Sequence, residues 1–360
     1  MELILKSFYK DKNILITGAT GFKGAWLSYW LYILGARVTG VGHNPNKNKN
    51  LFYSLKLEKK IHLKSLDVRD KRQLSKCIEI VKPDIIFHLA AQPLIYESYK
   101  NPFLTYEVNA LGTLNMLDCI KNNKNHKIRS VVFVTSDKCY YNNYSVVGFK
   151  EEDKLGGIDP YSGSKACAEI MINTYIESFF KKKKSIGIAS ARAGNVIGGG
   201  DYSPNRLIPD AIKSIVKNKE IFLRNPKFNR PWQHVLEPLY GYLILAEKLY
   251  AKPSNFSGAW NFGTKKNTVT NVEEIIKIII KFWGKGSLKV KKNNKFYEQE
   301  NLQLNISKSE KFLNWKPKFS ITESVEMTAD WYKKILINKL CAETVTKEQI
   351  LRYMNIDQKN

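Results

Sequence analysis

The fold is decided by the sequence KNILITGATGFKGAWLSYWLYILGA, residues 12–36. Its first residues, Lys12–Thr17, form a short apolar run that predicts a β-strand. Glycines follow at 18, 21 and 24, and the apolar residues after them recur on a helical period up to Gly35. Arg37–Val41 then predicts a second strand. A strand, a glycine turn and a helix in this order are the dinucleotide-binding fingerprint, and an incidental glycine turn is the weaker interpretation.

The glycine turn predicts a binding site for a pyrophosphate. The first glycine permits a tight turn, the second lets the backbone approach the phosphates, and the third allows the helix to pack closely on the strand. The amino end of the helix then receives the negative charge. The spacing G-x-x-G-x-x-G differs from the G-x-G-x-x-G of many dehydrogenases. We therefore expect cofactor contacts from the whole turn, namely Gly18, Thr20, Gly21, Phe22, Lys23 and Gly24.

The end of the second strand lacks the carboxylate that usually binds the adenosine ribose. The sequence there is VTGVGHNPNKNKN, with His43 and Asn44 in the expected place. Asn44 can still accept a hydrogen bond from a ribose hydroxyl, whereas Lys47 and Lys49 would tolerate a 2′-phosphate. Asn44 is therefore a predicted cofactor contact, and the choice between NAD and NADP stays open on these residues alone.

Two further strands are predicted to end at the same site. Asp67, in LKSLDVRD, follows a strand-like run and is expected to bind the adenine amino group, with Val68 beside it. The alternative role for Asp67 is a helix N-cap, which suits Asp70 better. The run KPDIIFHLAAQP predicts a fourth strand whose exit has small residues, and these leave room for a cofactor. Contacts to the cofactor are expected there from Leu89, Ala90, Ala91 and Gln92.

A long helix is predicted at Asn101–Ile120, with Asn109 inside it. Asparagine is a poor residue in the middle of a helix. We therefore place Asn109 at the cofactor site, where it would bond a helix-distorting water or a catalytic side chain. A tolerated surface asparagine is the alternative.

A fifth strand, Arg129–Thr135, is predicted to lead into the polar tip Ser136-Asp137-Lys138. After a loop, the segment Asp159-Pro160-Tyr161 begins a helix, with aspartate as the N-cap and proline in the first turn. The polar tip is therefore expected to face the start of this helix.

Tyr161 and Lys165 are four residues apart, so they share one face of that helix. An ammonium group beside a phenol stabilises the phenolate, and we expect Lys165 to lower the pKa of Tyr161 from about 10. Tyr161 can then act as a base that takes the proton of a sugar hydroxyl. Ser136 can hydrogen-bond the same hydroxyl from the end of the neighbouring strand.

The second half of the chain is predicted to bind the substrate. After strand six, SIGIASARAGNVIGGGD, the alternation of strand and helix loosens. We therefore divide the chain into residues 1–194, which hold the dinucleotide and the catalytic residues, and residues 195–360, which mainly bind the substrate. In this division the chain after residue 195 can cross back into the first domain. Arginine forks suit phosphate oxygens, with a structural salt bridge as the alternative for any one of them. The predicted substrate contacts are Asn195, Arg206, Arg224, Arg230, Gln233 and His234.

Composition argues against several other classes of protein. No apolar run approaches the ~18 residues of a membrane span, and the first residues lack the pattern of a secretory signal. The 5 cysteines are scattered without a C-x-x-C pair, so reduced thiols are expected, with neither disulfides nor a metal site. The formal charge of +25 comes from lysines spread along the whole chain, so a solvated surface is expected and no nucleic-acid partner. A cytoplasmic location and an anionic small-molecule substrate follow.

Several sequence blocks resemble one family. GATGFKGAWLS, HLAAQP, TSDKCY, LGGIDPYSGSKACAE, ARAGNVIGGGD, RLIPD and NRPWQHVLEPL are similar to blocks of the extended short-chain dehydrogenase/reductase family, and within it of the nucleotide-sugar 4,6-dehydratases. The resemblance covers essentially the whole chain. It implies an α/β fold, with a Rossmann-type doubly wound parallel sheet and a smaller mixed α/β C-terminal part for the substrate. It also implies bound NAD, a nucleotide-hexose substrate, and a dimer or tetramer formed through the helices that start near Asn101 and Pro160.

The resemblance assigns a role to each residue of the polar tip. Ser136, Tyr161 and Lys165 would form the dehydrogenase triad, and Asp137 would be the general acid for the departing 6-hydroxyl. Many relatives have a glutamate next, as the base for the carbon-5 proton, whereas this chain and the CDP-glucose subgroup have a lysine, here Lys138. That lysine would act either as the base or as a charge that stabilises the enolate. The pattern also places Thr135 on the cofactor and Gln92 and Leu207 on the substrate.

The implied reaction is that of a lyase acting on a nucleotide hexose, with CDP-glucose as the first choice. It combines oxidation at carbon 4, loss of water across carbons 5 and 6, and return of the hydride to carbon 6. The same scaffold leaves two alternatives, another nucleotide-sugar 4,6-dehydratase or a nucleotide-sugar epimerase. An epimerase needs the triad but no acid for a leaving 6-hydroxyl.

Overall fold

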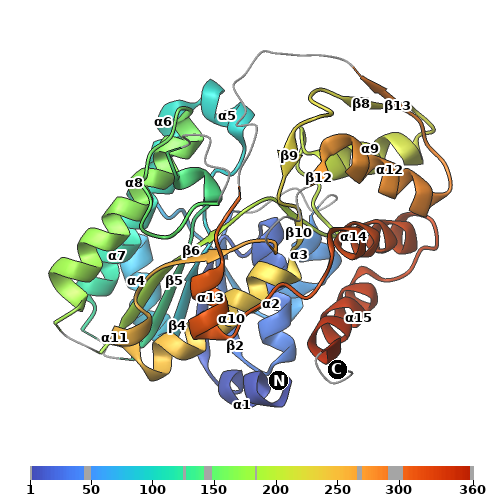
Figure 1. The fold of residues 1–360 in the computed structure, drawn as a ribbon. Helices are drawn as coiled ribbons and strands as arrows, with labels where there is room; N and C mark the ends of the chain where they lie inside the picture. The colour runs from blue at the N-terminus through green and yellow to red at the C-terminus, as the bar shows by residue number, and fades with distance from the viewer. Residues whose placement is uncertain are drawn as a thin grey trace.

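The protein is built on a doubly wound α/β sheet (Figure 1). The computed structural model describes residues 2–43, 50–124, 127–141, 148–182, 185–265, 270–290 and 303–356. Within these residues, seven strands form one parallel sheet in the order β11-β6-β5-β4-β1-β2-β3, which confirms the predicted fold class. The strands are β1 (Asn13–Thr17), β2 (Arg37–Gly42), β3 (His62–Ser65), β4 (Ile85–His88), β5 (Ser130–Val134), β6 (Gly187–Ala193) and β11 (Gly258–Phe262).

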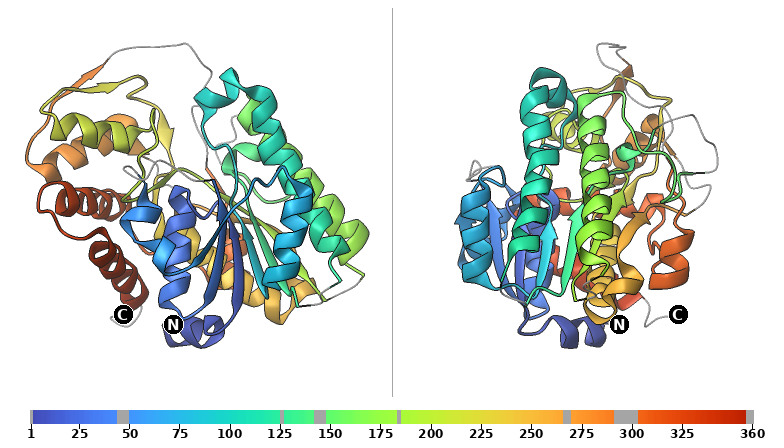
Figure 2. Two further views of the ribbon diagram at one scale, coloured as in Figure 1. Left: turned by 180° about the vertical axis from the view of Figure 1, so that it is seen from behind. Right: turned by 90° about the vertical axis from the view of Figure 1, so that its left-hand side faces the viewer.

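Helices cover both faces of the sheet, and each face has its own apolar core (Figure 2). In β1, Ile14 and Ile16 pack into one core and Leu15 into the other, because successive side chains of a strand point to opposite faces. An almost continuous apolar run is therefore what a strand covered on both sides requires. One face carries α4 (Lys71–Val81), α7 (Gly112–Asn122) and α8 (Pro160–Tyr175), and the other carries α2 (Phe22–Ile33) and α10 (Leu236–Ala251).

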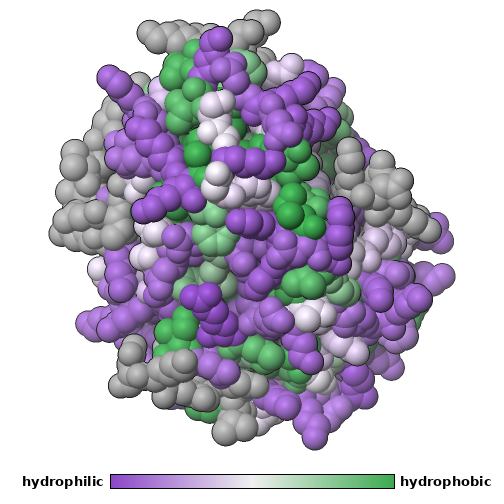
Figure 3. All heavy atoms as spheres, turned by 90° about the vertical axis from the view of Figure 1, so that its right-hand side faces the viewer, coloured by the Kyte–Doolittle hydropathy of each residue, from purple (hydrophilic) through white to green (hydrophobic). Residues whose placement is uncertain are grey.

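A smaller part of helices and short strand pairs packs beside the sheet (Figure 1). Its helix α12 (Val272–Trp283) begins with a capping box formed by Asn271 and Glu274. Figure 3 shows the face that this part contributes to, where hydrophilic residues surround small, separate apolar areas. The elements are β7 (Val196–Ile197), α9 (Leu207–Val216), β8 (Ile221–Leu223), β9 (Asn229–Arg230), β10 (Gln233–His234), β12 (Thr270–Asn271), α12 (Val272–Trp283), β13 (Leu288–Val290), α14 (Ile321–Leu336) and α15 (Ala342–Asn355).

The chain after residue 195 also contributes to the main sheet. β11 pairs in parallel with β6, with Gly258 opposite Ala189 and Phe262 opposite Ala193. The division of the chain at residue 195 stays a prediction, with this return of the chain as part of it. None of the described helices combines the length and the apolar character needed to cross a membrane. Further helical elements are α1 (Glu2–Tyr9), α3 (Leu51–Ser54), Leu57–Lys59, α5 (Ile95–Lys100), Asp137–Cys139, Ile176–Phe180, α11 (Pro253–Phe256) and α13 (Ser307–Leu313).

The helix predicted at Asn101–Ile120 contains a distortion at its asparagine. α6 (Pro102–Tyr106) passes into a π-helical turn, Glu107–Leu111, which continues as α7. Asn109 lies in this turn, where Oδ1 accepts a hydrogen bond from the Gln92 amide at 2.8 Å and Nδ2 donates to Ser164 Oγ at 2.9 Å. Such single π turns are often found at functional sites. Here the turn joins the loop after β4 to the helix that carries Tyr161.

A buried carboxylate anchors the end of the chain. Oε1 of Glu237 accepts hydrogen bonds from the amides of Lys318 (2.9 Å) and Phe319 (2.7 Å). Oε2 accepts one from the hydroxyl of Tyr353, on α15, at 2.6 Å. Burial outweighs these bonds and raises the pKa of Glu237 to about 7.

Candidate active site

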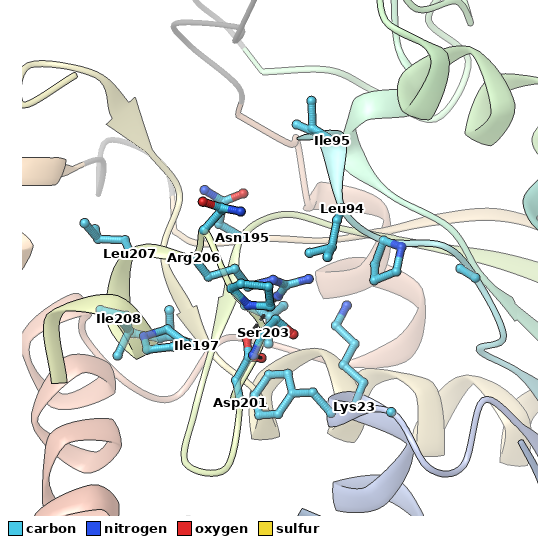
Figure 4. A pocket seen from close by; sticks show the side chains of 18 of the residues that line it. Lys23, Leu94, Ile95, Asn195, Ile197, Asp201, Ser203, Arg206, Leu207 and Ile208 are labelled. Atoms are coloured by element: carbon cyan, nitrogen blue, oxygen red, sulfur yellow. Dashed lines mark hydrogen bonds and ion pairs between the residues drawn. The ribbon is translucent and has the colours of Figure 1, made fainter. Parts of the chain in front are cut away.

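A cavity of about 1630 Å³ lies where the sheet meets the smaller part (Figure 4). The strand order reverses between β1 and β4, and the residues that follow both strands line the cavity. Such a switch point at the carboxyl ends of parallel strands is the usual ligand site of doubly wound sheets. The volume exceeds that of a typical single-ligand pocket, so a dinucleotide and a second ligand can both be accommodated.

The glycine turn after β1 has the shape that a pyrophosphate site requires. Gly18 has φ of 72°, and a Cβ there would lie 2.7 Å from the Ala90 nitrogen. A Cβ on Gly24 would lie 2.0 Å from the Gly18 carbonyl oxygen. Gly21 caps α2 without a side-chain hydrogen bond, so the first amides of the helix are left for an anion. All six residues predicted for the turn, including Thr20, Phe22 and Lys23, line the cavity.

The adenosine end of the predicted cofactor site is only partly described. Asn44 lies outside the described residues, as do Lys47 and Lys49. Asp67 and Val68 both line the cavity. The Asp67 carboxylate binds Arg69, whose Nη2 donates to Oδ2 at 2.7 Å, and this pairing lowers the Asp67 pKa. The N-cap of α4 is Asp70, whose Oδ1 accepts from the Gln73 amide.

The loop after β4 divides the predicted residues into two groups. Leu89, Ala90 and Ala91 line the cavity, whereas Gln92 and Asn109 do not. The side-chain amide of Gln92 is hydrogen-bonded within the protein. Its Nε2 donates to the Leu94 carbonyl oxygen and to Thr105 Oγ1, and its Oε1 accepts from the backbone N–H of Leu94. Asn109 binds both backbone groups of Gln92 and shapes the loop from behind. The positions of Gln92 and Asn109 therefore do not support the predicted direct contact with a ligand.

The polar tip is fixed by its own hydrogen bonds. The Ser136 hydroxyl donates to Oδ1 of Asp137 at 3.0 Å and accepts from the Lys138 amide at 3.2 Å. Asp137 is buried, and its Oδ2 has no hydrogen-bond partner among the described residues. Thr135 and all three residues of the tip line the cavity. Asp137 thus belongs to the cavity wall and has one carboxylate oxygen that no described residue hydrogen-bonds.

Tyr161 and Lys165 lie in the cavity wall on α8, as their spacing predicted. Burial raises the pKa of Tyr161 to about 12, although a hydrogen bond with Ser136 opposes the shift. Burial also lowers the pKa of Lys165 to about 8, and its ammonium lies 3.4 Å from the Val134 carbonyl oxygen. The expected lowering of the Tyr161 pKa is therefore wrong for this state of the site, because loss of hydration outweighs the neighbouring charges.

Lys23 brings a further cation into the cavity. Figure 4 shows its side chain rising from α2 with the amine directed toward Leu94. The amine lies 3.4 Å from the Tyr242 hydroxyl. Burial, together with the charges of Arg206 and Lys165, lowers the Lys23 pKa to about 7. A nearby anion would therefore favour its charged form.

The residues predicted for the substrate also divide into two groups. Asn195, Arg206, Leu207, Arg224 and Arg230 line the cavity, whereas Gln233 and His234 do not. Gln233 donates to the Phe262 carbonyl of β11 at 3.0 Å. His234 is fully buried, with edge-on contacts to Trp26 and Phe319, and burial lowers its pKa to about 3. These two side chains hold the smaller part on the sheet.

Asp201 was missed by sequence reasoning. It precedes the predicted arginine by five residues and forms an ion pair with Arg206 at 3.2 Å. The acid at the end of GGGD was a readable signal, because it lies close in sequence to the arginine expected to bind phosphate. Other lining residues that the sequence did not indicate are Pro93, Leu94, Ser203, Asn205, Ile208, Asp210, Phe228 and Trp232.

Comparison with known sequences identifies the family. The family model described as GDP-mannose 4,6 dehydratase matches residues 15–328. The chain is 41% identical over 336 residues to the CDP-glucose 4,6-dehydratase of Salmonella typhimurium, covering 92% of this chain and 93% of that protein. It is 26% identical over 345 residues to UDP-glucose 4-epimerase 2 of Oryza sativa subsp. japonica, covering 90% of this chain and 82% of that one.

Solved structures have the same fold. An epimerase of Methanothermobacter thermautotrophicus superposes with a TM-score of 0.81 at 23% identity, covering 94% of this chain and 98% of that one. The dTDP-glucose 4,6-dehydratase of Bacillus anthracis, solved in complex with NAD, superposes with a TM-score of 0.74 at 23% identity, covering 90% of this chain and 97% of that one. The sequence relatives, and the match of the model over most of the chain, show that this protein belongs to the GDP-mannose 4,6 dehydratase family of extended short-chain dehydrogenases/reductases.

Proposed function

We propose that this protein is an NAD-dependent CDP-glucose 4,6-dehydratase, a lyase that forms CDP-4-keto-6-deoxyglucose and water. The observation that carries the proposal is the polar tip Ser136-Asp137-Lys138 in one cavity wall with Tyr161 and Lys165. This tip combines a group for oxidation with a buried acid for water loss. The relative with 41% identity over almost the whole chain supports the choice of CDP-glucose.

The cavity fits a dinucleotide at its glycine turn. Gly18 and Gly24 let the turn pack tightly, because a Cβ on either would collide with neighbouring backbone, and the start of α2 offers amides without a side-chain cap to the pyrophosphate. Leu89, Ala90 and Ala91 would flank the nicotinamide side. The chemistry supplied by bound NAD is removal of a hydride from carbon 4 of the sugar and its later return to carbon 6.

Three residues serve the oxidation. Tyr161 takes the proton of the 4-hydroxyl, and Ser136 holds the same oxygen by a hydrogen bond. The pKa of Tyr161, about 12 in the structure, must fall for this step, and a positive charge beside the phenol provides the means. Arg206 already acts in this direction, and Lys165, on the same face of α8, would add to it when protonated.

Two residues serve the loss of water. The 4-ketone acidifies the proton on carbon 5, and the 6-hydroxyl must leave with a proton. Oδ2 of Asp137, which has no partner in the described part of the chain, gives its proton to that hydroxyl. Lys138 takes the carbon-5 proton or stabilises the enolate that remains.

The diphosphate of the substrate meets a basic part of the cavity. Arg206, Arg224 and Arg230 line it. A guanidinium can bind two phosphate oxygens at once, which a lysine cannot. A polyanionic nucleotide sugar therefore fits this side better than a neutral sugar.

The test is a panel of four nucleotide glucoses. The purified protein is incubated with NAD and CDP-, dTDP-, GDP- or UDP-glucose, and the 4-keto product is detected by its chromophore in base. We expect turnover that is fastest with CDP-glucose. Absence of the chromophore with all four substrates would reject the assignment as a dehydratase. A faster reaction with a glucose that carries another nucleotide would reject CDP-glucose as the preferred substrate.

We also propose that the protein forms a homo-oligomer, a dimer or a tetramer, and acts in the cytoplasm. α7 and α8 lie side by side at the surface (Figure 2), and the helices on this side of the sheet expose apolar residues. Phe103 is 76% exposed and Ile170 is 53% exposed. Sedimentation of the unaltered protein and of Phe103→Glu tests this, with dissociation expected for the variant. A monomeric unaltered protein would refute it.

A further inference from the structure

A buried ion pair lies behind the cavity wall. Glu169, on α8, is one helical turn beyond Lys165 and 2% exposed, and Arg192, on β6, is 3% exposed. Their side chains meet at 2.6 Å. Neither residue lines the cavity, so neither can touch a ligand there. A buried pair of this kind adds little to stability on balance, because both charges lose their hydration.

The carboxylate of this pair binds the residue that precedes the polar tip. The Thr135 hydroxyl donates to Oε1 of Glu169. The Ser190 hydroxyl donates to Oε2 at 2.8 Å, from the middle of β6. Thr135 adjoins Ser136 in the chain, whereas Ser190 lies on the neighbouring strand, opposite Phe133.

The guanidinium of the pair binds Tyr140, which follows the polar tip after one intervening residue, Cys139. Nη1 of Arg192 donates to the Tyr140 hydroxyl at 2.7 Å and to the Glu151 carbonyl oxygen at 2.9 Å. The Tyr140 hydroxyl in turn donates to Oδ1 of Asn261 at 2.8 Å. The Tyr140 ring stacks on Phe149 with centroids 4.9 Å apart. Tyr140 is therefore fixed by contacts to residues far from it in sequence.

We infer that the Glu169–Arg192 ion pair is a positioning pair, which holds the polar tip from both of its ends. Thr135 is tied to the carboxylate and Tyr140 to the guanidinium, so residues 136–139 span two anchors that are themselves bound to each other. A small displacement of a catalytic group costs a large part of the rate, which gives the pair a function that stability alone does not. The effect on rate rests on the proposed function, whereas the effect on the position of the tip does not.

Two matched pairs of variants test the inference. Thr135→Val and Ser190→Ala each remove one hydroxyl bonded to Glu169, but only the first is joined to the tip. Tyr140→Phe and Tyr9→Phe each remove one buried hydroxyl, and Tyr9 bonds the Leu243 carbonyl far from the cavity. The measurements are kcat and KM with the nucleotide sugar, and hydrogen–deuterium exchange of the peptide that covers residues 136–141.

We expect Thr135→Val and Tyr140→Phe to lower kcat about tenfold, the effect of one lost hydrogen bond, with KM within about twofold. Exchange in residues 136–141 should be faster in both, while Ser190→Ala and Tyr9→Phe keep kcat and local exchange. Equal losses within a matched pair, or an effect at one end of the tip alone, would overturn the inference. If Thr135→Val does not fold, Thr135→Ala replaces it. If the unaltered protein turns over no nucleotide sugar, the proposed function fails. The comparison of hydrogen–deuterium exchange in residues 136–141 then still tests whether the ion pair positions the polar tip.

Discussion

The Ser136 hydroxyl donates a hydrogen bond to Oδ1 of Asp137 across 3.0 Å, which leaves Oδ2 without a partner among the described residues. The serine proposed for oxidation therefore holds one oxygen of the carboxyl group proposed for water loss. The other oxygen is available to carry a proton. The two halves of the reaction meet in one pair of neighbouring residues, and they can be separated by changing the second of them.

Asp137→Asn should separate the two halves. The amide keeps an oxygen for the Ser136 hydroxyl but cannot give a proton to a leaving hydroxyl. We expect the 4-keto-6-deoxy product to form about 10²–10⁴-fold more slowly, the usual contribution of one acid–base group. Reduced cofactor should still appear transiently, as measured by absorbance at the NADH band in a stopped-flow instrument.

The control for this variant is Asp70→Asn. Asp70 caps α4 away from the tip, and asparagine caps a helix about as well. That protein should keep full turnover. Normal product formation by Asp137→Asn would remove the assigned acid and favour an epimerase on the same scaffold.

Tyr161→Phe should stop the reaction and leave the protein folded. The side chain is 8% exposed, so a phenylalanine fills the same space without a hydroxyl to bury. We expect kcat to fall about 10²–10⁴-fold. The melting temperature and the NAD dissociation constant, from calorimetry and fluorescence titration, should change little. An unfolded variant would instead identify a structural tyrosine.

Local patterns were sufficient to predict most strands of the sheet. The run Lys12–Ala36 placed β1, its glycine turn and α2 correctly, because each depends on residues close in sequence. An asparagine inside an apolar helix is unusual for the same local reason, and Asn109 lies in a π turn. The turn itself was not predicted, because it depends on bonds to Gln92 and Ser164 from two other elements.

Roles that depend on distant partners could not be predicted. Gln233 and His234 looked like substrate contacts beside Arg230, yet β11 and α2 bury them. The pKa of Tyr161 is raised, although the sequence predicts that it is lowered. Spacing along a helix indicates which charged residue is a neighbour, but it does not indicate how far burial removes water from the phenol. Polar residues near a predicted cavity are thus easier to place than to orient.

Lys23 should make anion binding depend on pH. Burial lowers its pKa to about 7 in the structure, Arg206 and Lys165 add to this shift, Asp137 opposes it, and the Tyr242 hydroxyl lies 3.4 Å from the amine. A bound pyrophosphate would raise that pKa, so binding above pH 7 takes up a proton. We expect NAD affinity to fall by up to about tenfold per pH unit above 7.

Two variants of Lys23 isolate this effect. Arginine stays charged over the whole range, so Lys23→Arg should bind NAD with little dependence on pH between 7 and 9. Lys23→Met should bind weakly at every pH and also without a slope. Calorimetry in buffers of different ionisation enthalpy measures the proton uptake directly. An unchanged slope in Lys23→Met would show that another group is responsible.

Glu237 should make the fold less stable as the pH rises. Its pKa is about 7 when folded, above the ordinary value of 4.5, so between these values the folded state holds a proton that the unfolded chain has released. The stabilisation is complete below about pH 4.5 and is lost as the pH rises through 7, by about 3 kcal/mol in all. Glu237→Gln imitates the neutral form and should lack this loss, while the exposed Glu326→Gln on α14 should follow the unaltered protein. Urea unfolding from pH 5 to 9 measures the difference, and parallel curves for Glu237→Gln and the unaltered protein would mean that the carboxylate stays charged in the fold.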